Sequence, residues 1–281
     1  DKTAAQGTTS NMEEKMYAFS PGGGIVYNHD DNWTWFLGVY KGFNVPSPGT
    51  ARDNGDPVEK ETSLAKEAGL RYSDQNFFFS GVLFHTYFEN LIVTDNSNTD
   101  SEPDNAGNVI TKGLELQANY EPENFLPAGL PGDISFFVNY TFTNANLDGA
   151  SSSTDHKASL FAGGMDGSNV PYVPDHRLSF GADYTWNKFD FGVGMTYQSE
   201  THGTASETET EVFGGSANAR AGKIDDYFLV NFRAGYQIND NYRITAGVNN
   251  AFDNEYIATR HPAGARAGAP LTAYFQASAT F

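Results

Sequence analysis

Residues 189–198 read Phe189-Asp-Phe-Gly-Val-Gly-Met-Thr-Tyr-Gln198 and alternate strictly between two kinds of side chain. The odd-numbered residues are large and apolar: Phe189, Phe191, Val193, Met195 and Tyr197. The even-numbered residues are small or polar. Because successive side chains of a β-strand point to opposite faces, this period of two predicts a strand whose two faces meet different surroundings.

The same alternation recurs along the whole chain. We expect eleven strands, near residues 18–28, 32–43, 63–73, 76–93, 110–121, 133–146, 175–187, 188–199, 226–237, 241–252 and 270–281. Short connections (28–32, 73–75, 122–132, 187–188 and 239–241) take turns with long ones (44–62, 94–109, 147–174, 200–225 and 253–269). Outer-membrane barrels have short periplasmic turns and long extracellular loops. The pattern therefore predicts an all-β fold, an antiparallel transmembrane β-barrel.

The strand count predicts that this barrel is larger than the chain. Single-chain bacterial barrels have an even number of strands, which places both ends on one side of the membrane. Eleven strands that begin outside do not satisfy that rule. We expect residues 18–281 to be the C-terminal half of a barrel of about 22 strands, the size class with a plugged lumen. Residues 1–17 would be an extracellular loop remnant, and Phe281 would lie on the periplasmic side.

Composition narrows the classes of function. Hydrophobic residues make up 39% of the chain, and no apolar run approaches the ~18 residues of a membrane helix, whereas a membrane strand needs only ~9–11. The chain has no cysteine, which excludes disulfides and cysteine-ligated metals. A net charge of −18 argues against nucleic acid as a partner, because nucleic-acid binding needs a basic surface. Hydrolase, P-loop and deaminase motifs do not occur, and the 6 histidines show no paired metal spacing, so we expect no enzyme activity.

Charged residues within the strands favour a barrel interior that is lined with charged side chains. The strand arginines are Arg71, Arg177, Arg233 and Arg243, and their expected partners are Glu67, Glu115, Asp183 and Asp190. A charge on the lipid face would cost ~2–4 kcal/mol at the bilayer midplane, so we expect these side chains to face the lumen. Residues 77–88 carry phenylalanine on both faces, which predicts either a bulge or a contact with the lumen.

Aromatic residues cluster near the strand ends, most of them beside short turns. They are Trp33, Trp35, Tyr72, Tyr120, Tyr184, Trp186, Tyr197, Tyr236 and Tyr242. Such rings are apolar with a polar tip, which suits a membrane interface. The alternative is the core of a soluble protein.

Five segments, in this order along the chain, resemble TonB-dependent outer-membrane receptors. They are Tyr40-Lys-Gly-Phe-Asn-Val-Pro-Ser-Pro-Gly49, Glu61-Thr-Ser-Leu-Ala-Lys-Glu-Ala-Gly-Leu-Arg71, Lys112-Gly-Leu-Glu-Leu116, Val173-Pro-Asp-His-Arg-Leu178 and Asn250-Ala-Phe-Asp-Asn-Glu-Tyr256. The resemblance spans about residues 18–281. Within the family, the segments 41–49 and 260–270 are most similar to the ferric-dicitrate receptor branch.

The resemblance implies an integral protein of the bacterial outer membrane that binds a ferric chelate at extracellular loops. Import would be driven by a TonB-type energy-transducing protein acting on a plug domain, for which this chain has no match. Iron would enter only as the transported chelate, with no resident cofactor or metal. Outer-membrane lipid would surround the barrel.

Ferric citrate is anionic, and arginine pairs bidentately with carboxylates. The candidate ligand contacts in the expected loops are Arg52, Arg220, Arg260 and Arg266, with His261 as a helper. Arg260 and Arg266 lead because they lie in the segment that resembles the citrate branch. The competing interpretation of each arginine is a salt bridge in a solvated loop.

Two other functions stay open. The first keeps the barrel and changes the ligand to another siderophore or a non-iron nutrient, because a net charge of −18 is a poor attractor for anions. The second is a soluble β-sandwich that serves as an adhesion or binding module. The acidic segment 95–105 is expected to be a mobile loop, with a calcium site as the alternative.

Overall fold

The computed structural model describes residues 17–46, 57–94, 103–123, 125–126, 130–151, 160–161, 163–207, 212–213, 216–217, 219, 221–261 and 264–280. The expected loop remnant therefore lies almost wholly outside the described residues, and Phe281 lies outside them too. Within these residues the structure contains no helix with the length and hydropathy that a membrane span requires.

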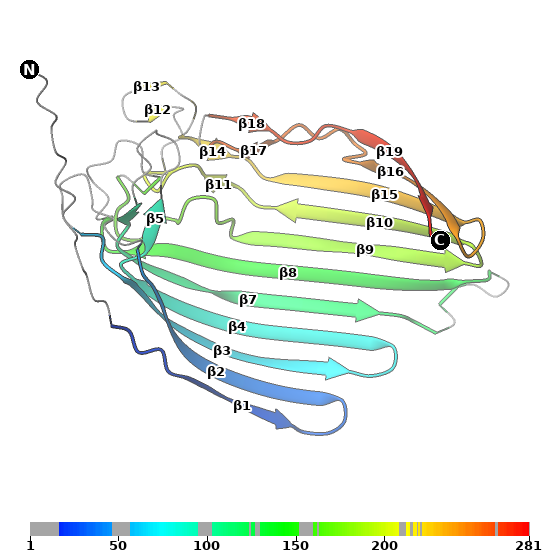
Figure 1. Cartoon of the computed structure of the whole chain (residues 1–281), viewed down its shortest axis with the longest axis horizontal. Coiled ribbons are helices and arrows are strands. Elements are labelled where there is room, and N and C mark those ends of the chain that lie inside the picture. Colours follow the sequence, from blue (N-terminus) through cyan, green and yellow to red (C-terminus); the bar gives the residue numbers. More distant parts are fainter. Residues whose placement is uncertain are drawn as a thin grey trace, which may run out of the picture.

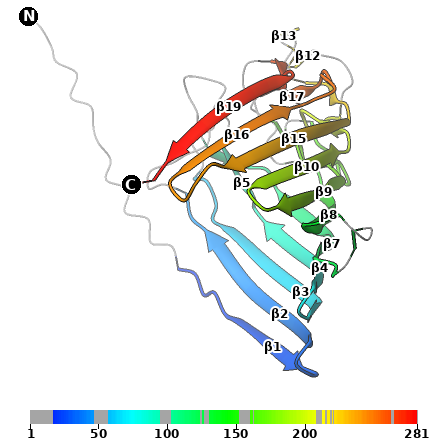
Figure 2. The ribbon, with the colours of Figure 1, turned by 90° about the vertical axis from the view of Figure 1, so that its right-hand side faces the viewer.

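The described strands form one large antiparallel sheet of 11 strands, each paired with its neighbours along the chain. They are β1 (Gly22–Asn28), β2 (Trp33–Asn44), β3 (Glu61–Ser73), β4 (Phe77–Glu89), β7 (Asn108–Tyr120), β8 (Asp133–Asp148), β9 (His176–Trp186), β10 (Phe189–Gln198), β15 (Tyr227–Gln237), β16 (Tyr242–Asn249) and β19 (Thr272–Ala279). The strands lie side by side in Figure 1, and Figure 2 shows that the sheet curves into an open arc with β1 and β19 at its edges. The predicted all-β fold and its eleven strands are confirmed.

Four small two-stranded sheets lie toward the end of the large sheet that carries the long connections (Figure 1). They pair β5 (Ile92–Thr94) with β6 (Pro103–Asn105), β11 (Thr201–His202) with β14 (Lys223–Ile224), β12 (Val212–Phe213) with β13 (Ser216–Ala217), and β17 (Ile257–Thr259) with β18 (Arg266–Ala267). The buried core among the described residues also lies at this end, around Ala106, Val109, Leu147, Phe161 and Ala205. The described core therefore lies between the long connections and the adjacent ends of β7 and β8, and not across the middle of the sheet.

The two faces of the sheet differ as the alternation predicts. Val193 of β10 is paired with Ala182 of β9 and Phe232 of β15, so these residues share one face, which we call the outer face. Its large apolar side chains are open to solvent: Leu83 is 61% exposed and Phe275 is 71% exposed. No second sheet covers this face among the described residues, which contradicts the β-sandwich alternative. An apolar surface of this extent is what contact with lipid requires.

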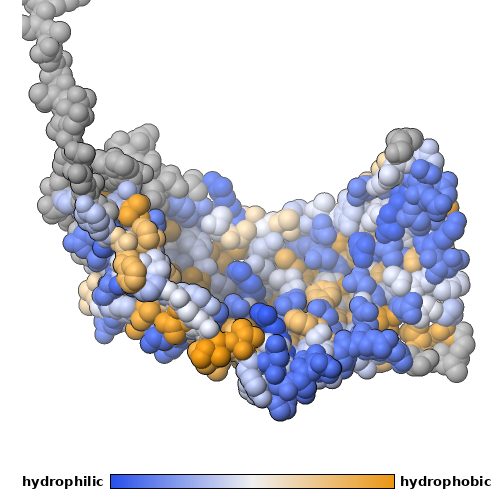
Figure 3. All heavy atoms as spheres, turned by 60° about the horizontal axis from the view of Figure 1, so that its bottom comes forward, coloured by the Kyte–Doolittle hydropathy of each residue, from blue (hydrophilic) through white to orange (hydrophobic). Residues whose placement is uncertain are grey.

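The opposite, inner face lines the hollow of the arc, where Figure 3 shows hydrophilic and hydrophobic residues intermixed. Its phenylalanines and tyrosines fill the space above glycines on neighbouring strands. A Cβ added to Gly69 would lie 2.5 Å from the Phe36 ring, and one added to Gly113 would lie 2.6 Å from the Phe84 ring. Phe137 covers Gly181 in the same way. A ring of this kind supplies the packing that a strand glycine lacks.

This packing resolves the ambiguity at residues 77–88. β4 pairs with β3 and with β7 without a shift of register. The phenylalanines therefore alternate between the outer and inner faces, and the prediction of a lumen contact fits better than a bulge. Phe88 packs against the buried cluster at the end with the long connections.

Aspartates cap two of the short turns. Asp30 Oδ1 accepts hydrogen bonds from the backbone N–H groups of Trp33 and Asn32, each at 2.8 Å. Asp74 accepts one from the Tyr72 hydroxyl at 2.7 Å and two from the backbone N–H groups of Asn76 and Phe77. Hydrogen bonds to a carboxylate stabilise its charged form. The pKa of the Asp74 carboxyl is therefore lowered, most strongly by the Tyr72 hydroxyl and less by the two backbone N–H groups. The turns are thereby fixed at the predicted positions.

Aromatic rings line the end of the sheet with the short turns. The rings of Trp33 and Tyr72 lie 4.9 Å apart, and those of Phe189 and Tyr236 lie 4.6 Å apart. Both pairs are directly opposed across neighbouring strands on the outer face. This arrangement agrees with the predicted interfacial girdle.

Candidate functional site

Three long connections meet at one end of the sheet and form what we call the outer loop cluster, residues 163–175, 199–207, 221–226 and 253–261 together with 219 and 264–270. The Gly203 backbone N–H donates to the Gly222 carbonyl at 2.9 Å, and the Tyr172 N–H donates to the His202 carbonyl at 3.1 Å. β11 pairs with β14, and β17 pairs with β18, within this cluster. Because the connections are hydrogen-bonded to one another, they form one continuous surface at this end of the sheet.

Arg260 is at the centre of the outer loop cluster and is only 5% exposed. Its guanidinium donates to the carbonyl of Lys223 at 3.0 Å and to that of Ala219 at 3.1 Å. Its backbone N–H donates to the Tyr172 hydroxyl at 3.3 Å. Gly222, with φ +110°, leaves room for the guanidinium, since a Cβ there would lie 3.3 Å from Arg260 Cζ. The guanidinium thus joins its own connection to the 200–225 connection, with carbonyls satisfying its donors. The backbone N–H joins both to Tyr172 of the 147–174 connection.

The other predicted ligand contacts are placed differently. Arg266 lies on β18, opposite Thr259, and is exposed. His261 is half-buried beside Arg260, and its backbone N–H donates to the Thr259 hydroxyl at 3.2 Å. Arg52 and Arg220 lie outside the described residues. The cluster therefore brings Arg260, His261 and Arg266 together on one short segment, and their contact with a ligand stays a prediction.

The segment that begins at Asn250 pins the final connection to the sheet. Asn250 is buried, and its amide donates to the carbonyls of Asn254 at 2.9 Å and Ala269 at 3.0 Å. Its backbone N–H donates to Asn231 Oδ1 at 2.9 Å. The ring of Tyr256 packs 4.4 Å from that of Tyr227 on β15. These contacts explain physically why the sequence carries asparagine and tyrosine at these positions.

An ion pair holds the base of β14 in the same cluster. Lys223 Nζ lies 2.5 Å from Glu200 Oε2 and 3.4 Å from Asp225 Oδ1. The hydrogen bond to Glu200 raises the pKa of the Lys223 ammonium. All three side chains are more than a third exposed, so solvent weakens this interaction.

Four strands contribute to a charge network on the inner face. Arg233 of β15 lies 2.9 Å from Asp183 of β9 and 3.0 Å from Asp190 of β10. Arg243 of β16 donates to Asp190 Oδ1 at 2.8 Å. Asp190 is the most enclosed member, with a side chain 14% exposed. The predicted lumen-facing ion pairs are confirmed for these residues.

The two remaining strand arginines have other partners. Arg177 donates to Gln198 Oε1 at 3.0 Å, in place of a carboxylate. The Arg71 guanidinium lies 4.8 Å from the centre of the Phe36 ring on the inner face, a cation–π contact. Neither arginine pairs with Glu67 or Glu115 among the described residues.

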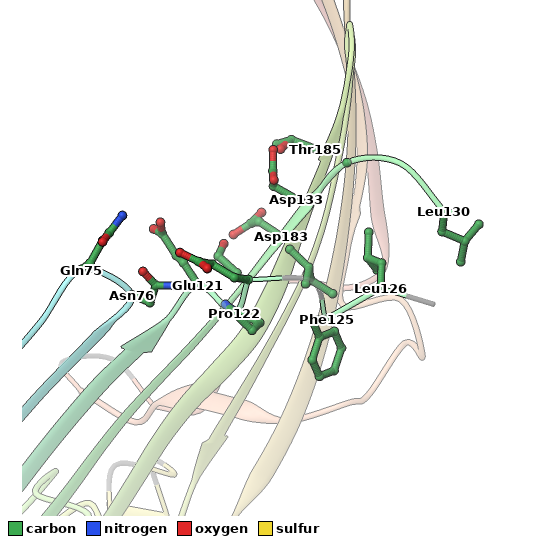
Figure 4. Close-up of a pocket in the computed structure, with 14 residues that line it drawn as sticks. Gln75, Asn76, Glu121, Pro122, Phe125, Leu126, Leu130, Asp133, Asp183 and Thr185 are labelled. Atoms are coloured by element: carbon green, nitrogen blue, oxygen red, sulfur yellow. The ribbon is translucent and has the colours of Figure 1, made fainter. Parts of the chain in front are cut away.

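An acidic pocket opens beside the charge network at the end with the short turns (Figure 4). It measures about 820 Å³ and is lined by Gln75, Asn76, Glu121, Glu123, Asp133 and Asp183, with Phe125, Leu126 and Leu130 on the other side. Sequence reasoning missed it, although acidic residues flank both ends of the 122–132 connection. A pocket of this character favours cationic groups.

The comparisons with known proteins agree on one kind of molecule. The family model "TonB dependent receptor-like, beta-barrel" matches residues 1–251. An uncharacterized TonB-dependent receptor of Haemophilus influenzae is 26% identical over 199 residues, which cover 68% of this chain and 52% of that protein. A ferric-pyoverdine BN7/BN8 receptor of Pseudomonas putida is 23% identical over 253 residues, covering 89% of this chain and 27% of that protein. The chain thus spans about half or less of the length of these relatives.

Among solved structures, the ferric citrate transporter FecA in its unliganded form superposes with a TM-score of 0.73 at 25% identity. The match covers 93% of this chain and 38% of that one.

Proposed function

The chain belongs to the TonB-dependent receptor β-barrel family of the bacterial outer membrane, and from this premise we propose that it is the barrel part of a receptor that imports a ferric chelate. The observation that carries the proposal is the superposition of 93% of the chain on a ferric citrate transporter. Relatives whose names include ferric-pyoverdine and catecholate siderophore support the same class of ligand. Transport of this kind involves no covalent chemistry, so we propose that the protein is not an enzyme.

Ferric citrate is the ligand that we propose to test first. The outer loop cluster supports an anionic chelate because Arg266 is exposed on β18, and guanidinium binds carboxylates bidentately. Arg260 has its donors on loop carbonyls, so in this proposal it shapes the surface while Arg266 and His261 contact the ligand. Arg52 and Arg220 stay candidates for the same role.

The inner face supports the remaining parts of the proposal. Its charge network and the acidic pocket would contact a plug domain, on which a TonB-type energy-transducing protein acts. The arc leaves β1 and β19 at the edges of the sheet, and unpaired strand edges are costly in a membrane. We therefore propose that further strands close the barrel, with residues 18–281 forming its C-terminal half.

Another siderophore or a non-iron nutrient is the second candidate. The net charge of −18 favours it, because the field of the whole chain repels anions and the local arginines must overcome that field.

Calorimetric titration of the full-length receptor tests the ligand. We expect ferric citrate to bind with measurable heat and the Arg266→Ala variant to bind at least about tenfold more weakly, the loss of one charge-assisted contact. Binding of a neutral or cationic ferric siderophore, without any heat from ferric citrate at several temperatures, would select the second candidate.

A further inference from the structure

Three basic side chains lie side by side on the apolar outer face. Lys66 of β3 is directly opposite His85 of β4, and His85 is directly opposite Lys112 of β7. Directly opposed residues have Cβ atoms about 4.5–5.5 Å apart, so the three side chains form one continuous row. We call Lys66, His85 and Lys112 the outer basic row. It lies in the halves of these strands that are nearer the long connections.

The outer basic row has no anionic partner within the described part of the protein. Neither lysine ammonium has a hydrogen bond or an ion pair there. The outer-face positions next to the row carry no acidic side chain: they are Leu37, Val39, Lys41, Leu64, Ala68, Leu83, Tyr87, Ile110, Leu114, Phe142, Asn144 and Asn146. A charge on the lipid face destabilises a barrel strand unless it is compensated. In a chain with a net charge of −18, unpaired lysines facing outward indicate an anionic partner outside the protein.

An apolar groove begins immediately beside the row, on the side away from the long connections. It measures about 570 Å³, and its lining includes Leu37, Ala68, Leu70, Leu83, Leu114 and Leu116. Ala68 and Leu83 are opposed in the pair that follows Lys66 and His85, and Leu83 is opposed to Leu114. The small residues Ala68 and Gly81 leave the space that the leucines enclose. The cationic outer basic row and the apolar groove therefore form one continuous surface.

We propose that the outer basic row and this groove bind a phosphorylated membrane lipid of the extracellular leaflet. The phosphate would contact Lys66 and Lys112, since lysine binds phosphate as a compact point charge, and one acyl chain would occupy the groove. The long connections lie outside in barrels of this type, which places the row toward that leaflet. The inference is independent of the ligand that the receptor transports.

The test uses the full-length receptor extracted from the outer membrane in non-ionic detergent. Native mass spectrometry should detect a retained phosphorylated lipid. Added lipopolysaccharide, which is anionic, should bind, while phosphatidylcholine, whose choline group cancels the charge of its phosphate, should not. The Lys66→Gln/Lys112→Gln double variant should lower retention at least about tenfold. Lys188→Gln, the same change in a short turn at the opposite end of the sheet, should leave retention unchanged. The Lys66→Arg/Lys112→Arg variant should keep the lipid, which separates charge from folding.

A second variant tests the groove and distinguishes a lipid from free phosphate. Ala68→Phe fills the groove without removing a charge, so it should reduce lipid retention while binding of inorganic phosphate is unaffected. Equal retention by the wild type and the double glutamine variant would overturn the proposal. So would complete displacement of the lipid by inorganic phosphate, which would indicate a simple anion site. Light scattering that shows a second copy seated on this face would overturn it too.

Discussion

The two faces of β10 allow a sharp test of how the sheet meets the membrane. Val193 lies near the middle of the strand on the outer face, opposite Ala182 and Phe232. Gly194 is its neighbour on the inner face, and a Cβ added there has no atom within 4 Å. Arginine at either position adds the same charge and the same length of side chain. Only the surroundings of the new side chain differ.

The expected costs follow from this geometry. Arginine on the lipid face at the bilayer midplane costs about 2–4 kcal/mol, which lowers the folding equilibrium constant about 30- to 700-fold. Gly194→Arg places the same group in a hydrated interior with open space and should change stability by less than about 1 kcal/mol. We therefore expect Val193→Arg to be less stable than Gly194→Arg by at least about 1 kcal/mol.

The assay is reversible urea unfolding of the full-length receptor in lipid vesicles, with Val193→Ala and Gly194→Ala as controls for the loss or gain of side-chain volume. Equal stability of the two arginine variants would refute the assignment of the outer face to lipid. A greater loss in Gly194→Arg would show that the faces are reversed.

Three further predictions concern polar contacts. Asp190→Asn should destabilise the barrel by about 1–3 kcal/mol, because Arg233 and Arg243 lose a charged partner. Arg233 is 44% exposed, so solvent weakens its part of this interaction. A double-mutant cycle with Arg243→Gln should give a coupling energy, and strict additivity would contradict the network. Arg260→Ala removes two charge-assisted hydrogen bonds and should raise amide hydrogen exchange at residues 219–224 at least about tenfold while urea unfolding of the sheet is unchanged; unchanged exchange would contradict its role in joining the connections. The pKa of Asp74 is lowered below its ordinary value of 3.8, so the turn is stabilised above that pH and this stability is lost as the pH falls through the folded pKa; NMR titration of Asp74 should show the lowered value, and an unshifted midpoint would contradict the capping geometry.

The strands and their faces could be predicted from the sequence because each depends on local alternation. Residues 189–198 determine both faces of β10 without reference to any other segment. Parity predicted that Asp190 and Arg243 share the inner face. The two side chains meet across β15 because Gly235 of that strand has no side chain between them.

The features that depend on cross-strand register could not be predicted in this way. The ring of Phe84 packs over Gly113 on the inner face, and only the pairing of β4 with β7 brings these two residues together. Lys66 and Lys112 likewise belong to one row only because the strand register places His85 between them.

Arg260 shows a different limit of sequence reasoning. An arginine in a polar connection indicates a ligand contact as well as a structural one, because both uses need the same donors. Its burial arises from two connections that are distant in sequence, one around Tyr172 and the other around Ala219 and Lys223. The acidic pocket was missed for a similar reason, since Asp183 joins Glu121 and Asp133 only through the fold.

Uptake of radioactive iron by cells that carry the full-length receptor as their sole ferric-chelate receptor tests the central claim most directly. We predict that iron supplied as an anionic chelate, ferric citrate first, accumulates in these cells. Accumulation should stop when the TonB-type partner is deleted and should fall in the Arg266→Ala variant. A receptor that reaches the cell surface folded, yet supports no uptake of any ferric chelate, would contradict the account.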